Sequence, residues 1–156
     1  MIRLRRERDE RGAVAIVVAV FSLVMVLIAA FAVDLGVQRV ARRDMQSLAD
    51  IVALDLAREL DGRTVGDLNP LMAGLAKASV QRNEGAIGEE PALKVELGRL
   101  DPNGDFVKLT AATDVPSAVR VEAATSVGFA FVPGRGAAVR SAVADEVKVE
   151  VAEAGS

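Results

Sequence analysis

The segment that decides the fold is residues 12–33, which read GAVAIVVAVFSLVMVLIAAFAV. Across this run Ser22 is the only side chain that carries a polar atom. An α-helix rises about 1.5 Å per residue, so the segment would extend roughly 33 Å, enough to cross a hydrocarbon core of about 30 Å. A chain of 156 residues could hardly surround such a helix with protein on all sides. The sequence therefore predicts a transmembrane helix rather than a buried core helix.

The charges that flank this span predict its orientation. Five arginines lie in residues 1–11, whereas the twenty residues after the span contain three. Because positively charged flanks are retained in the cytoplasm, we expect the N-terminus inside and nearly all of the remaining chain outside the membrane. The arginines are Arg3, Arg5, Arg6, Arg8 and Arg11 before the span, and Arg39, Arg42 and Arg43 after it.

A cleaved secretory signal is the main alternative. Ala30-Phe31-Ala32 has the small-x-small form of a signal-peptidase site, and a basic region precedes it. Cleavage after Ala32 would release a secreted, soluble binding protein. The apolar run is longer than the usual signal-peptide core of about 7–15 residues, and neither Gly nor Pro breaks it before the candidate site. These features favour a retained anchor.

The composition excludes several kinds of functional site. The chain has no His and no Cys, which rules out imidazole bases, thiol nucleophiles, disulfides and the zinc, haem or iron–sulfur sites that need these ligands. It also lacks Gly-x-Ser-x-Gly and Walker motifs. A basic tip, an uncharged span and an acidic body are typical of membrane topology rather than nucleic-acid binding. We therefore expect no enzyme, no cofactor or metal, and no nucleic-acid partner.

The predicted helix does not stop at the membrane. After Val33 the apolar residues recur at spacings of three and four, which is typical of an amphipathic helix, and Gly62 supplies a stop signal. The result is a rod of roughly 75 Å, half in lipid and half outside. The apolar positions of the outer half are Val37, Ala41, Met45, Leu48, Val52, Leu56 and Leu60, and its polar sides carry Arg39, Arg43, Gln46, Asp50 and Arg58.

A set of small residues recurs along one side of the helix. Small side chains allow helix backbones to approach closely in lipid, so this side is a candidate packing face for another membrane helix. The alternative is that Ala is simply common in this chain, and the sequence does not separate the two. The residues are Gly12, Ala15, Ala19, Ser22, Ala29 and Gly36, with Val26 and Val33 filling the gaps.

Three short strings carry a resemblance to a known family. They are RGAVA at residues 11–15, AVDLG at residues 32–36, and RRDMQSLAD at residues 42–50, followed by Ala53-Leu54. Over residues 8–60 the chain resembles the N-terminal region of the TadG-like proteins of the Flp pilus (tight adherence) assembly system. Met45 and Ile51-Val52 depart modestly from the usual residues.

This resemblance implies a bacterial membrane protein that acts by helix packing with other pilus-assembly or pilin-like subunits, as a homo- or hetero-oligomer. Related pilins are cleaved after a Gly and carry a Glu five positions later, but the fifth residue after Gly12 is Val17. The resemblance therefore implies an uncleaved assembly factor or minor component. We expect Asp34 to pair with Arg39 or a neighbouring helix, or else simply to reach water. The other expected interaction residues are the small residues above and Gly36, Arg39, Arg42, Arg43, Gln46 and Asp50.

The outer part, residues 62–156, predicts a small pilin-like α+β domain with an antiparallel sheet. We expect a loop over residues 62–69 and a short helix over residues 70–83, with Pro70 in its first turn. Alternating apolar residues then predict four or five strands, at 93–97, 106–110, 119–123, 137–143 and 147–151.

Two turns punctuate these strands. Residues 101–105 read DPNGD, a hairpin signal because Asn-Gly accepts positive φ. The same residues have the spacing of a calcium loop, but Phe106 and Ala112 stand where Gly and Glu are needed. Residues 133–136, PGRG, predict a second turn. The predicted divisions are a cytoplasmic tip (1–11), the span (12–33), its helical continuation (34–61) and the outer domain (62–156).

Overall fold

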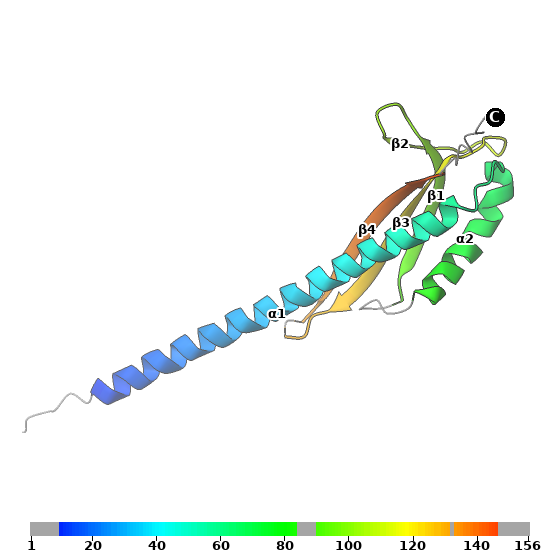
Figure 1. Ribbon diagram of the computed structural model, residues 1–156. Coiled ribbons are helices and arrows are strands. Elements are labelled where there is room, and N and C mark those ends of the chain that lie inside the picture. Colours follow the sequence, from blue (N-terminus) through cyan, green and yellow to red (C-terminus); the bar gives the residue numbers. More distant parts are fainter. Residues whose placement is uncertain (1–9, 84–89, 132, 147–156) are drawn as a thin grey trace, which may run out of the picture.

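The computed structural model describes residues 10–83, 90–131 and 133–146. Its first helix runs far beyond the rest of the domain at one end and lies along a sheet at the other (Figure 1). The strands form one antiparallel sheet in the order β2-β1-β3-β4, so the predicted α+β class is confirmed. The elements are α1 (Glu10–Ala57), α2 (Val65–Arg82), β1 (Ala92–Leu100), β2 (Phe106–Lys108), β3 (Ala118–Gly128) and β4 (Arg135–Asp145).

Helix α1 is continuous through the span and its amphipathic extension, as predicted. Its apolar stripe outside the span is buried against the sheet, and the helix passes through Gly36 without a break. The chain leaves α1 through Asp61 and Gly62, whose φ angles of 42° and 66° reverse its direction. The buried positions of the stripe are Ala41, Met45, Leu48, Ala49, Val52, Ala53, Leu56 and Ala57, with Leu60 just beyond the helix.

Helix α2 begins five residues earlier than predicted, so the expected loop over residues 62–69 is wrong. Thr64 is the N-cap, and its side chain accepts a hydrogen bond from the Asp67 backbone N–H while the Asp67 carboxylate bonds back to Thr64. This reciprocal cap satisfies two of the free donors at the helix start. Pro70 therefore lies inside the helix rather than at its first turn. Pro gives up one helical hydrogen bond there, which the cap and buried contacts of α2 outweigh.

The sheet has one face against the helices and one polar face. On β3, Val119, Val121 and Ala123 are fully buried beneath α1, which contacts β3 and β4. The intervening residues Arg120 and Glu122 lie on the other face, where the Arg120 guanidinium sits 4.3 Å from the centre of the Phe106 ring. Period-two alternation of the sequence thus separates a core face from a solvent face.

The strand boundaries correct several predictions. Strand β2 ends at Lys108 rather than at 110, and β4 runs over Arg135–Asp145 instead of 137–143. The second predicted turn is therefore shorter than expected, because Arg135 and Gly136 already belong to β4. The predicted short helix ends at Arg82, one residue before the predicted end. The predicted strand at 147–151 lies outside the described residues.

The hairpin between β1 and β2 has the predicted turn. The Asp101 carboxylate accepts hydrogen bonds of 2.8 Å from the backbone N–H groups of Asn103 and Asp105, and Gly104 has a φ of 85°. These bonds, above all the one from Asp105, lower the pKa of Asp101 because they stabilise its charged form. The turn is thus held by a local carboxylate network.

A polar contact joins α1 to α2. The Ser79 hydroxyl, which is fully buried, donates a 2.6 Å hydrogen bond to the Asp55 carboxylate, and Arg82 approaches the same oxygen at 2.9 Å. The Ser79 bond is the main cause that lowers the pKa of Asp55, and Arg82 adds to it. This contact fixes the angle between the two helices on one side of the sheet.

Candidate interaction site along helix α1

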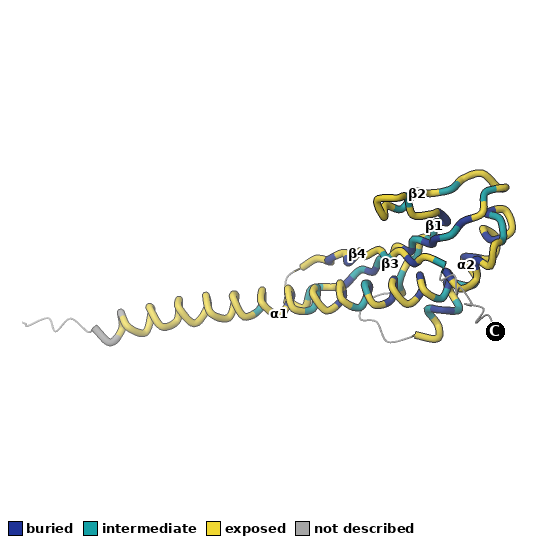
Figure 2. The backbone as a smooth tube through the Cα atoms, turned by 45° about the horizontal axis from the view of Figure 1, so that its top comes forward, coloured by how far each residue is buried: buried dark blue, intermediate teal, exposed yellow. Residues whose placement is uncertain are grey.

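The apolar half of α1 lies outside the domain. Within it is a window of 18 residues with a mean hydropathy of 3.1, and none of that window is buried. Figure 2 shows this part of the helix as a continuous exposed rod, whereas buried segments alternate with exposed ones beside the sheet. Exposed apolar surface of this extent marks a surface that meets lipid or protein. By length and composition it is enough to cross a membrane.

The predicted small residues are all exposed, and the structure extends their line. In one unbroken helix the line continues past the apolar half at alternating steps of three and four, on the side of α1 turned away from the sheet. We call this surface the outer seam. Every one of its residues is exposed: Gly12, Ala15, Ala19, Ser22, Val26, Ala29, Val33, Gly36, Val40, Arg43, Ser47, Asp50 and Leu54. Steps that average 3.5 residues are the spacing of helices that cross at a shallow left-handed angle.

The predicted charged and polar residues are distributed around this seam. Arg43 and Asp50 lie on it, and Arg39 is exposed beside it. Gln46 is half-buried and donates a 2.9 Å hydrogen bond to the Asp50 carboxylate one turn on. Arg42 is exposed but lies roughly 100° around the helix from Arg43, because each residue advances the helix by that angle. The predicted residues therefore do not form a single face.

Asp34 occupies a different environment from its neighbours. Its side chain is buried, with 3% of its surface exposed, so the interpretation that it simply reaches water is wrong. One carboxylate oxygen accepts a 2.7 Å hydrogen bond from the Ala130 N–H, and both oxygens lie 3.3 Å from the Phe131 N–H. Asp34 thus binds the backbone of the loop between β3 and β4 to the end of the apolar span. Pairing of Asp34 with an arginine remains a prediction.

This contact between Asp34 and the loop could not be found in the sequence. The partners are 96 and 97 residues apart, and backbone N–H groups leave no mark on the sequence. The nearest signal is Gly136, where an added Cβ would lie 2.7 Å from the Gln38 amide nitrogen and 3.2 Å from the Phe129 ring. That close approach leaves little room for a side chain and packs the hairpin against α1 just beyond Asp34.

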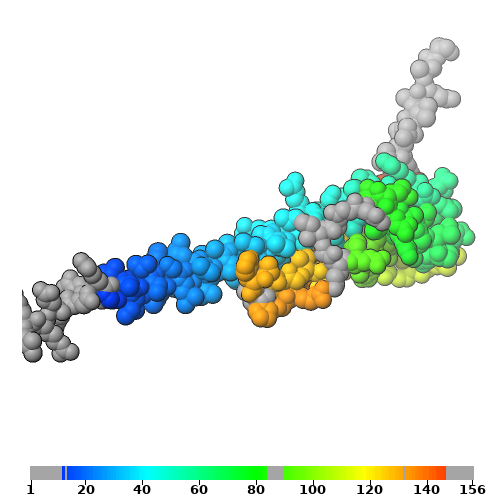
Figure 3. All heavy atoms as spheres, turned by 90° about the horizontal axis from the view of Figure 1, so that it is seen from below, coloured from blue at the N-terminus to red at the C-terminus, as the bar shows by residue number. Residues whose placement is uncertain are grey.

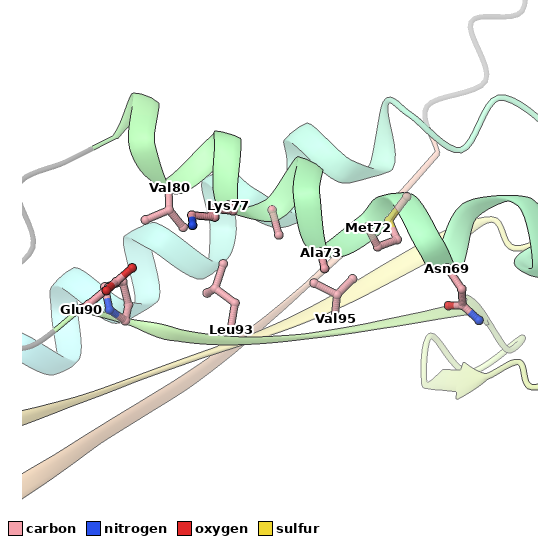
Figure 4. Close-up of a pocket in the computed structure, with 10 residues that line it drawn as sticks. Asn69, Met72, Ala73, Lys77, Val80, Glu90, Leu93 and Val95 are labelled. Atoms are coloured by element: carbon pink, nitrogen blue, oxygen red, sulfur yellow. The ribbon is translucent and has the colours of Figure 1, made fainter.

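A shallow groove lies between α2 and β1, away from the outer seam. It has a volume of about 380 Å³, with Met72, Ala73 and Val80 on the helix wall opposite Leu93 and Val95 on the strand (Figure 4). The charged side chains that line it are Lys77 and Glu90. In the described part of the chain no group of three or more His, Cys, Asp or Glu side chains could hold a metal ion. The groove is thus lined by apolar side chains together with Asn69, Lys77 and Glu90.

A protein-family model matches the part of the chain that forms helix α1. The family described as "Putative Flp pilus-assembly TadE/G-like" matches residues 12–57, which is α1 almost from end to end. The predicted resemblance of the N-terminal region is thereby confirmed for this segment. Comparison with curated proteins and with solved structures gave no match. Residues 12–57 thus resemble that family, and the chain from residue 58 onward lies outside the match.

Proposed function

We propose that this chain is a single-pass membrane component of a Flp/Tad-type pilus assembly or secretion machine. The observation that carries the proposal is the coincidence of three features in α1: the family match over residues 12–57, an apolar half with no buried window, and a second half that forms the core of a folded domain. The protein acts as a structural subunit rather than as an enzyme. One helix, α1, provides both the membrane anchor and the surface on which other subunits pack.

The arginine-rich residues 1–11 stay in the cytoplasm, and the sheet domain lies outside. The support is the excess of arginine before the span together with the position of Asp34. Because Asp34 is the first residue after the apolar run and is bonded to the β3–β4 loop, the domain begins where the membrane ends. The exit point therefore needs no flexible linker.

Partner subunits pack on the outer seam. Inside the membrane the seam is small and apolar, which allows close backbone approach. Outside, the same line carries Arg43, Ser47 and Asp50 before it reaches Leu54, whose side chain is 54% exposed. A partner that follows the seam must therefore itself continue as a helix beyond the membrane and offer polar groups there. Other membrane-anchored pilus-assembly or pilin-like subunits fit this description.

Site-specific photo-crosslinking tests the packing face. The chain has no cysteine, so single cysteines at Ser47 and Leu54 can carry a maleimide photoprobe in native membranes. We expect both probes to capture the same membrane proteins, identified by mass spectrometry. Arg42→Cys is the matched control, because it is exposed at a similar height on another side of α1. Equal capture from all three positions, or none from the seam, would refute the seam as the packing face.

Gene deletion tests the biological role. Cells that lack the chain should lose surface pili or adherence, and the full-length chain should restore them. Unaltered pili in the deletion strain would refute the role in pilus assembly. The same strains test the alternative of a secreted, soluble binding protein. A protein cleaved after Ala32 would accumulate in the culture medium with Val33 as its first residue, whereas the anchored protein would stay in the membrane.

A further inference from the structure

The tip of the β3–β4 hairpin lies at the end of the sheet domain that is nearest the apolar span of α1. Figure 3 shows orange atoms of this hairpin against the blue and cyan part of α1, at the end of the domain nearest the span. The Asp34 carboxylate holds the backbone N–H groups of Ala130 and Phe131 at that level. Ala30, one turn before Asp34 on the same side, is half-buried, whereas the other described residues from 14 to 33 are exposed. The domain thus reaches one turn below Asp34.

Helix geometry gives the height of this tip relative to a bilayer. Residues 12–33 extend roughly 33 Å, so a hydrocarbon core of about 30 Å ends close to Asp34. The headgroup layer beyond it is about 5–8 Å thick on each side. Hydrogen-bonded to Asp34, Phe131 falls in the layer where headgroups meet hydrocarbon. Arg39 comes five residues after Asp34 in α1. It therefore lies about 7.5 Å farther from the membrane centre than Asp34, at the outer edge of the headgroups.

The exposed side chains at this height suit that layer. Phe131 is 63% exposed, although it is one of only five phenylalanines in the chain, and Val33 and Leu35 beside the exit are 47% and 39% exposed. Arg135, at the start of β4, and Arg39 are also exposed. Surfaces that rest in a membrane interface typically combine apolar side chains with basic ones, and here both lie at the end of a lipid-facing span.

We propose that the β3–β4 hairpin tip is a second membrane contact of this protein, with Phe131 inserted into the interface of the outer leaflet. The proposal rests on the span of α1 under the proposed function and adds a fixed height and tilt of the domain to it. With two points of contact, the helix and the hairpin, the tilt of the domain relative to the bilayer is restricted, because α1 and the sheet share one core. The outer seam is thereby presented at a fixed tilt.

The hydrogen bonds at the tip make this insertion physically acceptable. Backbone N–H groups that enter the interface lose water and need another acceptor. The carboxylate of Asp34 accepts from Ala130 and Phe131, and these donors in turn compensate a buried charge at the membrane boundary. Aspartate and the loop therefore satisfy one another at the depth where neither is well hydrated.

Tryptophan fluorescence in vesicles tests the contact, because the chain has no Trp and no Tyr. Three single-Trp variants of the full-length chain are reconstituted into phosphatidylcholine–phosphatidylglycerol vesicles. Phe131→Trp probes the hairpin, Phe21→Trp probes the middle of the span, and Val115→Trp probes an exposed loop that precedes β3. Vesicles that contain lipids brominated near the headgroup or near the chain ends supply quenchers at two depths.

We expect Phe131→Trp to emit at shorter wavelength than Val115→Trp and to lose most of its fluorescence to the shallow quencher. Phe21→Trp should be quenched by the deep one. If Phe131→Trp behaves like Val115→Trp while Phe21→Trp is quenched, the hairpin contact is refuted and the span stands. If Phe21→Trp is not quenched either, the proposed membrane span itself fails. Far-UV circular dichroism of each variant confirms that the exposed substitutions leave the fold intact.

Discussion

Replacing Asp34 by alanine should loosen the junction between the span and the domain. In the wild-type chain the carboxylate accepts from two backbone N–H groups, with the shortest contact 2.7 Å to Ala130. The variant keeps the helix, since Ala is a strong helix former, and removes only these acceptors. The effect should therefore be concentrated in the β3–β4 loop.

The size of the effect follows from the hydrogen bonds. A hydrogen bond to a charged group contributes about 1.5–3 kcal/mol. Ala130 and Phe131 are exposed in the protein, so the water that remains in the headgroup layer can replace part of what is lost. We therefore expect the free energy of loop opening to fall by about 2–3 kcal/mol rather than by the full sum of two bonds. Because about 1.4 kcal/mol is a factor of ten, amide exchange at Ala130 and Phe131 should speed up roughly 30- to 150-fold.

Hydrogen exchange of the full-length chain in detergent micelles, read by mass spectrometry or NMR, measures this change. Asp50→Ala is the matched control, because Asp50 is an exposed aspartate on the same helix whose described hydrogen bond is to Gln46. It should leave exchange in the loop unchanged. Wild-type exchange rates at Ala130 and Phe131 in the Asp34→Ala variant would show that the carboxylate does not hold the loop.

Three further predictions concern the domain. Leu56→Ala, at a side chain only 1% exposed, should lower the free energy of unfolding by about 2–5 kcal/mol. Leu54→Ala, on the outer seam, should change it by less than about 0.5 kcal/mol in detergent. Denaturant titration followed by circular dichroism compares the two variants. Ser79→Ala should cost about 1–2 kcal/mol at neutral pH, because it removes the bond that holds the pKa of Asp55 below its ordinary value of 3.8. A depressed pKa contributes stability above pH 3.8 that is lost as the pH falls through the folded-state value, so the wild-type chain should lose more stability on acidification than the variant, and equal losses would refute the linkage. Gly98→Ala should displace β2, since its Cβ would lie 2.5 Å from the Val107 carbonyl oxygen, and should speed amide exchange at Leu109, whereas Gly74→Ala, which meets nothing within 4 Å, should not.

The sequence was a reliable guide wherever one period ran for many residues. The apolar run and the spacing of Met45, Leu48, Val52 and Leu56 predicted a continuous helix, and the structure buries all four of these side chains. The strand pattern of β1 and β3 was also correct, because one face of the sheet is buried under α1 and the other is polar. In these segments the local pattern and the tertiary contacts require the same structure.

The errors arose where two local signals competed or where contacts were distant. At α2, Pro70 predicted a helix that begins at residue 70, whereas the Thr64–Asp67 cap begins it at Val65. This cap has Asp where the usual box has Glu or Gln. At the candidate site Asp34 was singled out for its place at the end of the apolar run, but its hydrogen bonds to Ala130 and Phe131 could not be predicted, because backbone donors 96 and 97 residues away leave no pattern. The extension of the outer seam past the apolar half of α1 became clear only once the buried side of the helix was known.

The proposed function requires that α1 stays in the bilayer and holds the sheet domain outside it. A single cysteine at Asn103, in the exposed turn between β1 and β2, is the most direct probe of that claim. Intact spheroplasts are treated with a membrane-impermeant maleimide, and the membranes are then washed with alkaline carbonate. We expect the cysteine to be labelled and the labelled protein to remain in the membrane pellet. Labelling only after the cells are permeabilised, or release of the protein by carbonate, would contradict it.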